Sequence, residues 1–304
     1  MTEPRTVPMP DVQTFLLPAH AYLLSMRDQN LPLRRVALDD ARSAYRDAPQ
    51  TTAHERQVAR IALVALVGET LQILEDLAAY ADSFSTAPEG TAFFAALTRY
   101  NAFRANNFYA QMKKRPPEYF LDLLGLRRGP LRLEEAFVVD PPFTDEELAA
   151  IDEAHGATAK LVGKHLTNLA DEWRKYRPFA NTYKHGLLVA NPEDVTLLND
   201  DGAEVDGIVV WQRRRPGAEG YGHISPPFKE MADYLADVAK VALDVLDHLV
   251  DSRLRIFELI DLRADGSWKL KPLTTTPWQW WFDKNDLSEP SRALLSARFR
   301  IEFA

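Results

Sequence analysis

The chain has 304 residues and a formal charge of −8, with 46% hydrophobic and 26% charged residues, a composition typical of a folded globular protein. This acidic balance argues against a protein that coats long nucleic acids non-specifically. Cysteine is absent, which excludes disulfides, thiolate metal sites and cysteine nucleophiles.

The hydropathy pattern contains neither a visible secretory leader nor an apolar run of membrane-spanning length. We therefore expect a cytoplasmic location and no membrane partner.

Two long helices are predicted in the first half of the chain. Residues 54–84 carry an apolar stripe at helical spacing that runs through Leu66 and Leu77. Residues 91–114 form the second, and Pro116 and the proline after it end the helix. Weaker helical patterns cover residues 12–27, 33–46, 119–124 and 290–299.

Two more long helices are predicted further along the chain. The third opens at Thr144, where Thr144 and Glu147 have the spacing of a capping box. The fourth carries a heptad seam from Phe228 to Leu249 and is expected to continue to about residue 262. A flanking stripe that includes Leu246 predicts that this helix contacts more than one neighbour.

The pattern between the third and fourth long helices changes to short apolar runs typical of strands. The predicted fold class is therefore mainly α: a helical bundle of four long helices with a small β-hairpin insertion near 187–213. We expect one domain over residues 1–304, and its parts are a helical extension (1–50), a bundle core (54–114 and 144–262), the β insertion, and a Trp-rich hydrophobic clasp (265–304).

The strongest functional signal is the run of polar and cationic residues that closes the third helix. Arg177, Asn181 and His185 are four residues apart, so one helix face presents a guanidinium, an amide and an imidazole together. Arg174 and Lys184 add cations beside them. These groups can bind a phosphate and transfer a proton, but they are equally typical of an ordinary helix C-terminus that ends at a glycine.

The segment from Asn181 to Gly186, which follows a long helix with upstream arginines, resembles the HEPN superfamily of prokaryotic helical bundles. The resemblance implies a role in a stress or defence system, a homodimer with a composite site, an antitoxin-like protein partner, and metal-independent RNA cleavage without a cofactor. His185, Arg177 and Asn181 would then be catalytic, and Lys184 and Arg174 would bind phosphate. The chain departs from the family pattern because seven residues separate Arg177 from His185, a longer gap than usual.

Pro178 is a second departure, since proline removes a helical hydrogen bond and predicts a kink or a restart after Arg177. The alternative function is a non-catalytic helical interaction or ligand-binding module, in which Arg177 and His185 are structural.

Two further patterns have ordinary interpretations. Glu69, Gln72 and Asp76 share a helix face, but the Glu-x-x-His pairs of a di-iron bundle are missing, so no metal site is predicted. We expect Glu69 to be an ion-pair partner and His155, on an apolar stripe, to be a core histidine. Basic runs such as residues 113–115 are predicted to be solvated surface.

Overall fold

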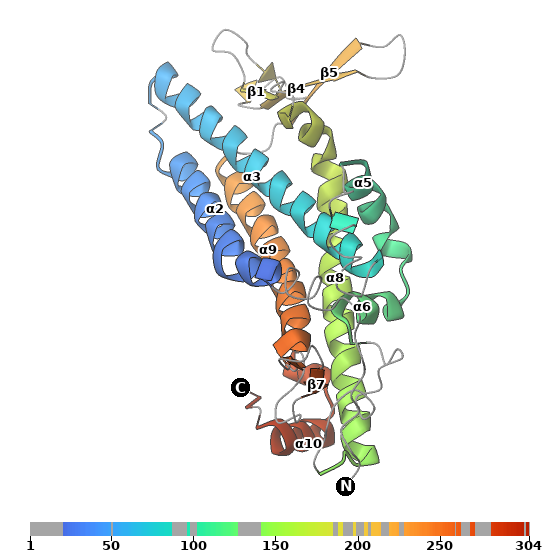
Figure 1. Ribbon diagram of the computed structural model, residues 1–304. Helices are drawn as coiled ribbons and strands as arrows, with labels where there is room; N and C mark the ends of the chain where they lie inside the picture. Colours follow the sequence, from blue (N-terminus) through green and yellow to red (C-terminus); the bar gives the residue numbers. More distant parts are fainter. Residues whose placement is uncertain are drawn as a thin grey trace.

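The computed structural model is mainly helical, as the sequence predicts (Figure 1). It describes residues 21–49, 51–86, 96–97, 102–126, 141–184, 188–190, 197–198, 204–205, 208–213, 219–224, 228–258, 260–262, 268–270, 281–300 and 302–303. The α-helices are α2 (Leu31–Arg46), α3 (Ala53–Thr86), α5 (Ala102–Gln111), α6 (Pro117–Leu124), α8 (Asp145–Lys184), α9 (Phe228–Glu258) and α10 (Glu289–Phe299). The short helical turns are η1 (Met26–Asn30), η2 (Met112–Lys114) and η3 (Lys284–Asp286).

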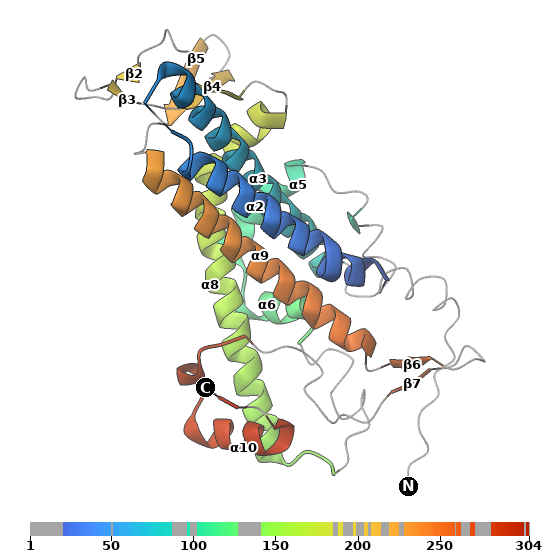
Figure 2. The same ribbon diagram turned by 90° about the vertical axis from the view of Figure 1, so that its left-hand side faces the viewer.

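Helices α2, α3 and α9 pack against one another, and α8 packs on both α3 and α9. Figure 2 shows α2 and α9 side by side, with α3 next to them. Helix α8 extends past this group at the end where α10 lies, and its other end reaches the strands (Figure 1). Buried apolar side chains from all four helices join one core.

Helix α3 confirms the first long helix of the sequence pattern. Its predicted stripe is buried, with Leu66 and Leu77 both at 0% exposure. Two capping boxes begin α3 and α8. The backbone N–H of Thr144 donates to the Glu147 carboxylate (3.0 Å), and the N–H of Glu147 donates to the Thr144 hydroxyl (3.2 Å), as predicted. Thr52 and Glu55 make the same exchange before α3.

The second predicted helix lies partly outside the described residues. Within the described part, α5 ends at Gln111 and a tighter turn, η2, takes the chain to Lys114. Pro116 is extended and precedes α6, so the prolines do end the helix here. Gly125 closes α6 with φ 71°, a left-handed conformation that favours glycine.

Helix α9 confirms the predicted start of the fourth long helix, but its predicted continuation to residue 262 is wrong. The helix ends at Glu258, and Ile260–Leu262 (β6) pairs antiparallel with Trp268–Leu270 (β7). The reason is that backbone pairing with β7 replaces helical hydrogen bonds there. Leu246 and the seam residue Leu249 are both buried, and α9 contacts α2, α3, α6 and α8. Most of the described apolar residues of α9 are therefore covered within one chain, and Tyr234 is an exception at 42% exposure.

Short strands lie between α8 and α9, at one end of the molecule (Figure 1). They are β1 (Leu188–Ala190), β2 (Leu197–Leu198), β3 (Glu204–Val205), β4 (Ile208–Arg213) and β5 (Glu219–Ile224). They form an antiparallel sheet in the order β1-β4-β5 and a separate β2-β3 pair. In the first sheet Val189 is opposite Val209, and Val209 is opposite His223.

The C-terminal segment packs against α8 at the opposite end of the molecule. Ser288 caps α10, and both its backbone N–H and its hydroxyl donate to the carboxylate of Glu153 on α8. Trp281, from the predicted clasp, stacks on His165 with ring centroids 4.9 Å apart and lies 5.1 Å from the ring of His248. Residues 265–267, 271–280, 301 and 304 of the predicted clasp lie outside the described residues.

A search of the described helices finds none that is long and apolar enough to cross a membrane.

Candidate functional site at the end of helix α8

Four of the five predicted site residues, Arg174, Arg177, Asn181 and Lys184, lie on the last three turns of α8. Arg174 and Arg177 are exposed, whereas Trp173 and Tyr176 beside them are buried at 3% and 2% exposure. Helical spacing places the backbones of Asn181 and Lys184 on the same side as the arginines. The side chains of Asn181 and Lys184, and the whole of His185, lie outside the described residues, so convergence on one phosphate stays a prediction.

The buried side of this part of α8 is anchored to two neighbouring helices. The indole N–H of Trp173 donates to the side-chain oxygen of Asn106 on α5 (3.0 Å), and Tyr109 stacks on Trp173 with ring centroids 5.3 Å apart. The Tyr109 hydroxyl in turn donates to the carbonyl of Leu74 on α3 (2.6 Å). These contacts fix the rotation of α8 about its axis, and with it the direction in which Arg174 and Arg177 leave the helix.

Carboxylates partly balance the cations of this region. Asp171 accepts from Lys113 at 2.7 Å and lies 3.4 Å from Arg174. The hydrogen bond from Lys113 lowers the pKa of Asp171, so this carboxylate stays ionised. Lys175 lies 3.9 Å from Glu172 and 4.9 Å from the ring centroids of both neighbouring tyrosines, Tyr176 and Tyr234. Arg177 is the exposed cation nearest the helix end whose side chain the structure describes.

Pro178 does not interrupt the helix. The expectation of a restart after Arg177 is wrong, because α8 continues without a break to Lys184. Proline has no N–H to give the carbonyl of Arg174, so that carbonyl loses its helical donor. Packing of Trp173 and Tyr176 in the core holds the preceding turns in place.

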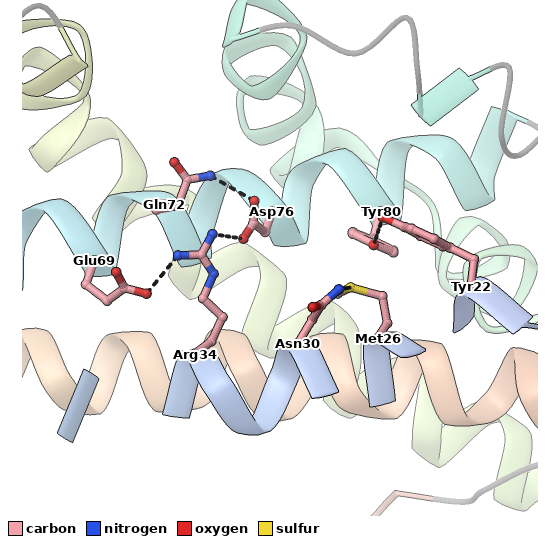
Figure 3. Close-up of polar contacts among 8 residues, drawn as sticks. All are labelled: Tyr22, Met26, Asn30, Arg34, Glu69, Gln72, Asp76 and Tyr80. Carbon is pink, nitrogen blue, oxygen red and sulfur yellow. Dashed lines mark hydrogen bonds and ion pairs between the residues drawn. The ribbon is translucent and has the colours of Figure 1, made fainter. Parts of the chain in front are cut away.

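A second polar cluster lies between α2 and α3 (Figure 3). It contains Glu69, Gln72 and Asp76, for which the sequence predicts a shared helix face but no metal site. Arg34 reaches from α2 to Glu69 (3.0 Å) and to Asp76 (3.1 Å), and Gln72 donates to the other Asp76 oxygen (2.9 Å). The interpretation of Glu69 as an ion-pair partner is therefore confirmed. A guanidinium fills the space between the two carboxylates, and within the described part of the chain no cluster of three or more metal-ligating side chains is found.

Burial governs the titration of this cluster. Desolvation raises the pKa of Asp76 above its usual value, and the Arg34 charge opposes the rise only in part. At the far end of the cluster the Tyr80 hydroxyl donates to that of Tyr22 (2.7 Å), and the two rings stack (Figure 3). The cluster is a clamp between two helices.

Sequence reasoning missed a concave surface on the middle of α8. A groove of about 480 Å³ lies between η2, the start of α6 and residues 156–168 of α8. Lys113 and Arg115 line it, although the basic run 113–115 was predicted to be solvated surface. Lys160 and Lys164 line it from α8, and their spacing of one helical turn was the signal available in the sequence. By contrast, the core position predicted for His155 is confirmed, at 3% exposure.

Comparison with protein-family models, with curated proteins and with solved structures gives no match for this chain.

Proposed function

We propose that this chain is a HEPN-like protein of a prokaryotic stress or defence system and that the end of α8 forms part of a metal-independent ribonuclease site. The proposed scaffold is a bundle of the long helices, with the β insertion beside the site. The observation that carries the proposal is the exposure of Arg174 and Arg177 on a helix whose opposite side is anchored in the core. Asn181, Lys184 and His185 follow Arg177 along the chain, with a longer gap between Arg177 and His185 than the family pattern has.

The proposed chemistry assigns one role to each side chain. His185 accepts the proton of the ribose 2′-hydroxyl, whose oxygen attacks phosphorus while the bond to the 5′-oxygen breaks. A second imidazole, from the other copy of the motif in a homodimer, donates a proton to the leaving 5′-oxygen. Arg177, Arg174 and Lys184 stabilise the charge on the pentacoordinate phosphate, and Asn181 orients the imidazole. The products are a 2′,3′-cyclic phosphate and a 5′-hydroxyl.

The proposal extends to three partners. RNA is the substrate, a second copy of the chain completes the site, and an antitoxin-like protein restrains the activity. Most of the described apolar residues of α9 are covered within the chain, so the dimer that we propose through the long helices must use faces that remain exposed.

The test is RNA cleavage in EDTA by the wild type and by His185→Ala. We expect cleavage by the wild type, and a fall of roughly a hundredfold or more in the variant, because general acid–base catalysis contributes about that factor. His54→Ala is the matched control, since His54 is an exposed histidine at the start of α3. It removes an imidazole without touching α8 and should leave cleavage unchanged.

Thermal unfolding of the same variants separates catalysis from structure. A catalytic His185 at an exposed helix end contributes only about 1 kcal/mol to stability, so both variants should melt close to the wild type. A wild type without cleavage in EDTA, combined with a clearly destabilised His185→Ala, would contradict the ribonuclease proposal.

The rival function is a non-catalytic helical interaction module, and one observation favours it. Four large apolar side chains are exposed on the packed pair α2 and α3: Leu33 (66%), Val36 (56%), Val58 (45%) and Ile61 (57%). Large exposed apolar side chains offer contact area to a partner protein. They are also available to a homodimer, so they support association whether or not the site is catalytic.

A further inference from the structure

The groove between η2, α6 and α8 carries a charge opposite to that of the molecule. Four of its described lining residues are cationic, namely Lys113, Arg115, Lys160 and Lys164, and none of them is acidic. The whole chain has a net charge of −8. Lys160 and Lys164 lie one turn apart on α8, about 6 Å along the helix axis. Cations from two separate elements therefore face one hollow.

Nearby carboxylates leave part of this positive charge unbalanced. Asp171 forms an ion pair with Lys113 at 2.7 Å. Asp286 lies 3.6 Å from Lys160, whose side chain is 78% exposed. For Lys164, no ion pair is found with any residue that the structure describes. Long exposed lysine side chains can turn towards an anion, and exposed ion pairs of this kind are weak competitors.

The bottom of the groove is apolar and is kept open by small residues. Phe120 lies so close to Gly163 that a Cβ atom there would be 3.0 Å from the ring. Gly156 is the opposite case, because a Cβ atom at that position would meet nothing within 4 Å. Glycine inside a helix costs about 1 kcal/mol relative to alanine. The glycine that leaves this space open at position 156 therefore makes the helix less stable than alanine would.

We propose that this groove binds a small organic phosphate with at least two negative charges. The phosphate would lie among Lys113, Arg115, Lys160 and Lys164, and an aromatic or aliphatic part would lie on the apolar floor, against Pro117 and the edge of Phe120. Several cations around one point favour a dianion over a single carboxylate. The volume of about 480 Å³ lies within the range of small-molecule sites, which favours a compact ligand over an extended nucleic-acid strand. This site is separate from the predicted site at the end of α8 and goes beyond the proposed ribonuclease function.

The experiment measures binding of 1-naphthyl phosphate to the full chain by titration calorimetry. We expect saturable binding to the wild type and roughly tenfold weaker binding to Lys164→Met, since a charge-assisted hydrogen bond contributes about that factor. Lys114→Met is the matched control, because Lys114 is exposed next to Lys113 but does not line the groove. It should bind as the wild type does.

A second pair of variants tests the cavity itself. Gly156→Leu places a side chain into the open space and should abolish binding while the helix remains folded. Gly156→Ala adds only a methyl group and should retain binding. Far-ultraviolet circular dichroism checks that each variant is folded. If Gly156→Leu does not fold, Lys164→Met still tests the proposal independently.

Four results would overturn the proposal. The first is no saturable binding of 1-naphthyl phosphate at millimolar concentration, and the second is undiminished binding to folded Gly156→Leu. The third is equally tight binding of inorganic phosphate, which would show that the apolar floor contributes nothing. The fourth is a short RNA whose binding is weakened by Lys164→Met, together with no binding of 1-naphthyl phosphate. This result would make the groove a nucleic-acid surface.

Discussion

Two glycines seven residues apart on α8 show how one residue type serves opposite purposes. Gly163 allows the Phe120 ring to approach the helix, with a Cβ contact of 3.0 Å if alanine were present, whereas the space at Gly156 is open. Phe120 is buried and packs edge-on against Tyr119, with ring centroids 5.4 Å apart. The ring therefore has little room to move away.

This difference predicts opposite effects of the same substitution. Gly156→Ala should raise the free energy of unfolding by about 1 kcal/mol through helix propensity. Gly163→Ala should lower it, because overpacking costs about 1–3 kcal/mol and the propensity gain offsets only part of that. Urea unfolding of both variants measures the difference. Equal stabilisation by the two substitutions would show that Phe120 yields easily.

The sequence could predict single residues where their type has one dominant environment. His155 on an apolar stripe and Glu69 on a polar helix face were both interpreted correctly. Lys160 and Lys164 were not singled out, because two exposed lysines one turn apart are ordinary on a helix surface. Only the packing of η2 and α6 beside α8 makes them part of a groove, and that packing is a tertiary property.

At the scale of elements, α2 is attached to its neighbours by arginines that point in two directions. Arg34 pairs with Glu69 and Asp76 on α3, while Arg35 pairs with Asp244 (2.9 Å) and Asp247 (3.2 Å) on α9. Because half-exposed ion pairs contribute little each, the buried leucines of α2 supply most of the packing energy. The arginines instead fix which faces meet.

The clamp on α3 predicts a pH dependence of stability. Burial raises the pKa of Asp76 in the folded state, so the folded protein holds this proton to higher pH than the unfolded chain does. Stability from this group is fully present below the unfolded pKa, close to 4, and is lost as the pH rises through the raised folded pKa. Asp76→Asn removes this titration.

We therefore expect the unfolding free energy of the wild type, relative to Asp76→Asn, to fall as the pH rises from about 4 through the mildly acid range. Chemical unfolding of both proteins at several pH values measures this difference. A difference that instead increased with pH would mean that Arg34 outweighs burial and that the pKa of Asp76 is lowered.

Helical periodicity was sufficient to locate the long helices but not all of their ends. The start of α8 was predictable because the capping box is local chemistry between Thr144 and Glu147. The end of α9 was not, because β6 forms through pairing with β7 rather than through its own residues. The restart expected after Arg177 is wrong for a related reason: core packing of Trp173 and Tyr176 outweighs the local preference of proline to end a helix.

At the scale of the whole molecule, the exposed apolar residues predict association. The start of α3, with Val58 and Ile61, lies at the same end of the molecule as the end of α8 (Figure 1), so a dimer through α2 and α3 could bring two copies of the proposed site together. We expect a dimer at about tens of micromolar in analytical ultracentrifugation. Val36→Glu combined with Ile61→Glu should make it monomeric, because burying unpaired charges is costly.

Asn107→Glu is the control for added charge, since Asn107 is exposed on α5. It should leave the dimer intact. A wild type that sediments as a monomer over the same range would exclude this association, and with it a site shared between two copies.

Helix α8 also fixes the angle about its axis between the groove lysines and the arginines near its end. The lysines of the groove and the arginines near its end belong to one uninterrupted helix, so each residue inserted between them turns one set against the other by about 100°. One added residue between positions 165 and 173 would point the arginines elsewhere or pull Trp173 out of the core. Seven added residues, close to two full turns, would nearly restore the phase but would move Trp173 about 10 Å along the helix axis from its partners on α5. The relative direction of the two sites therefore depends on the exact number of residues between them.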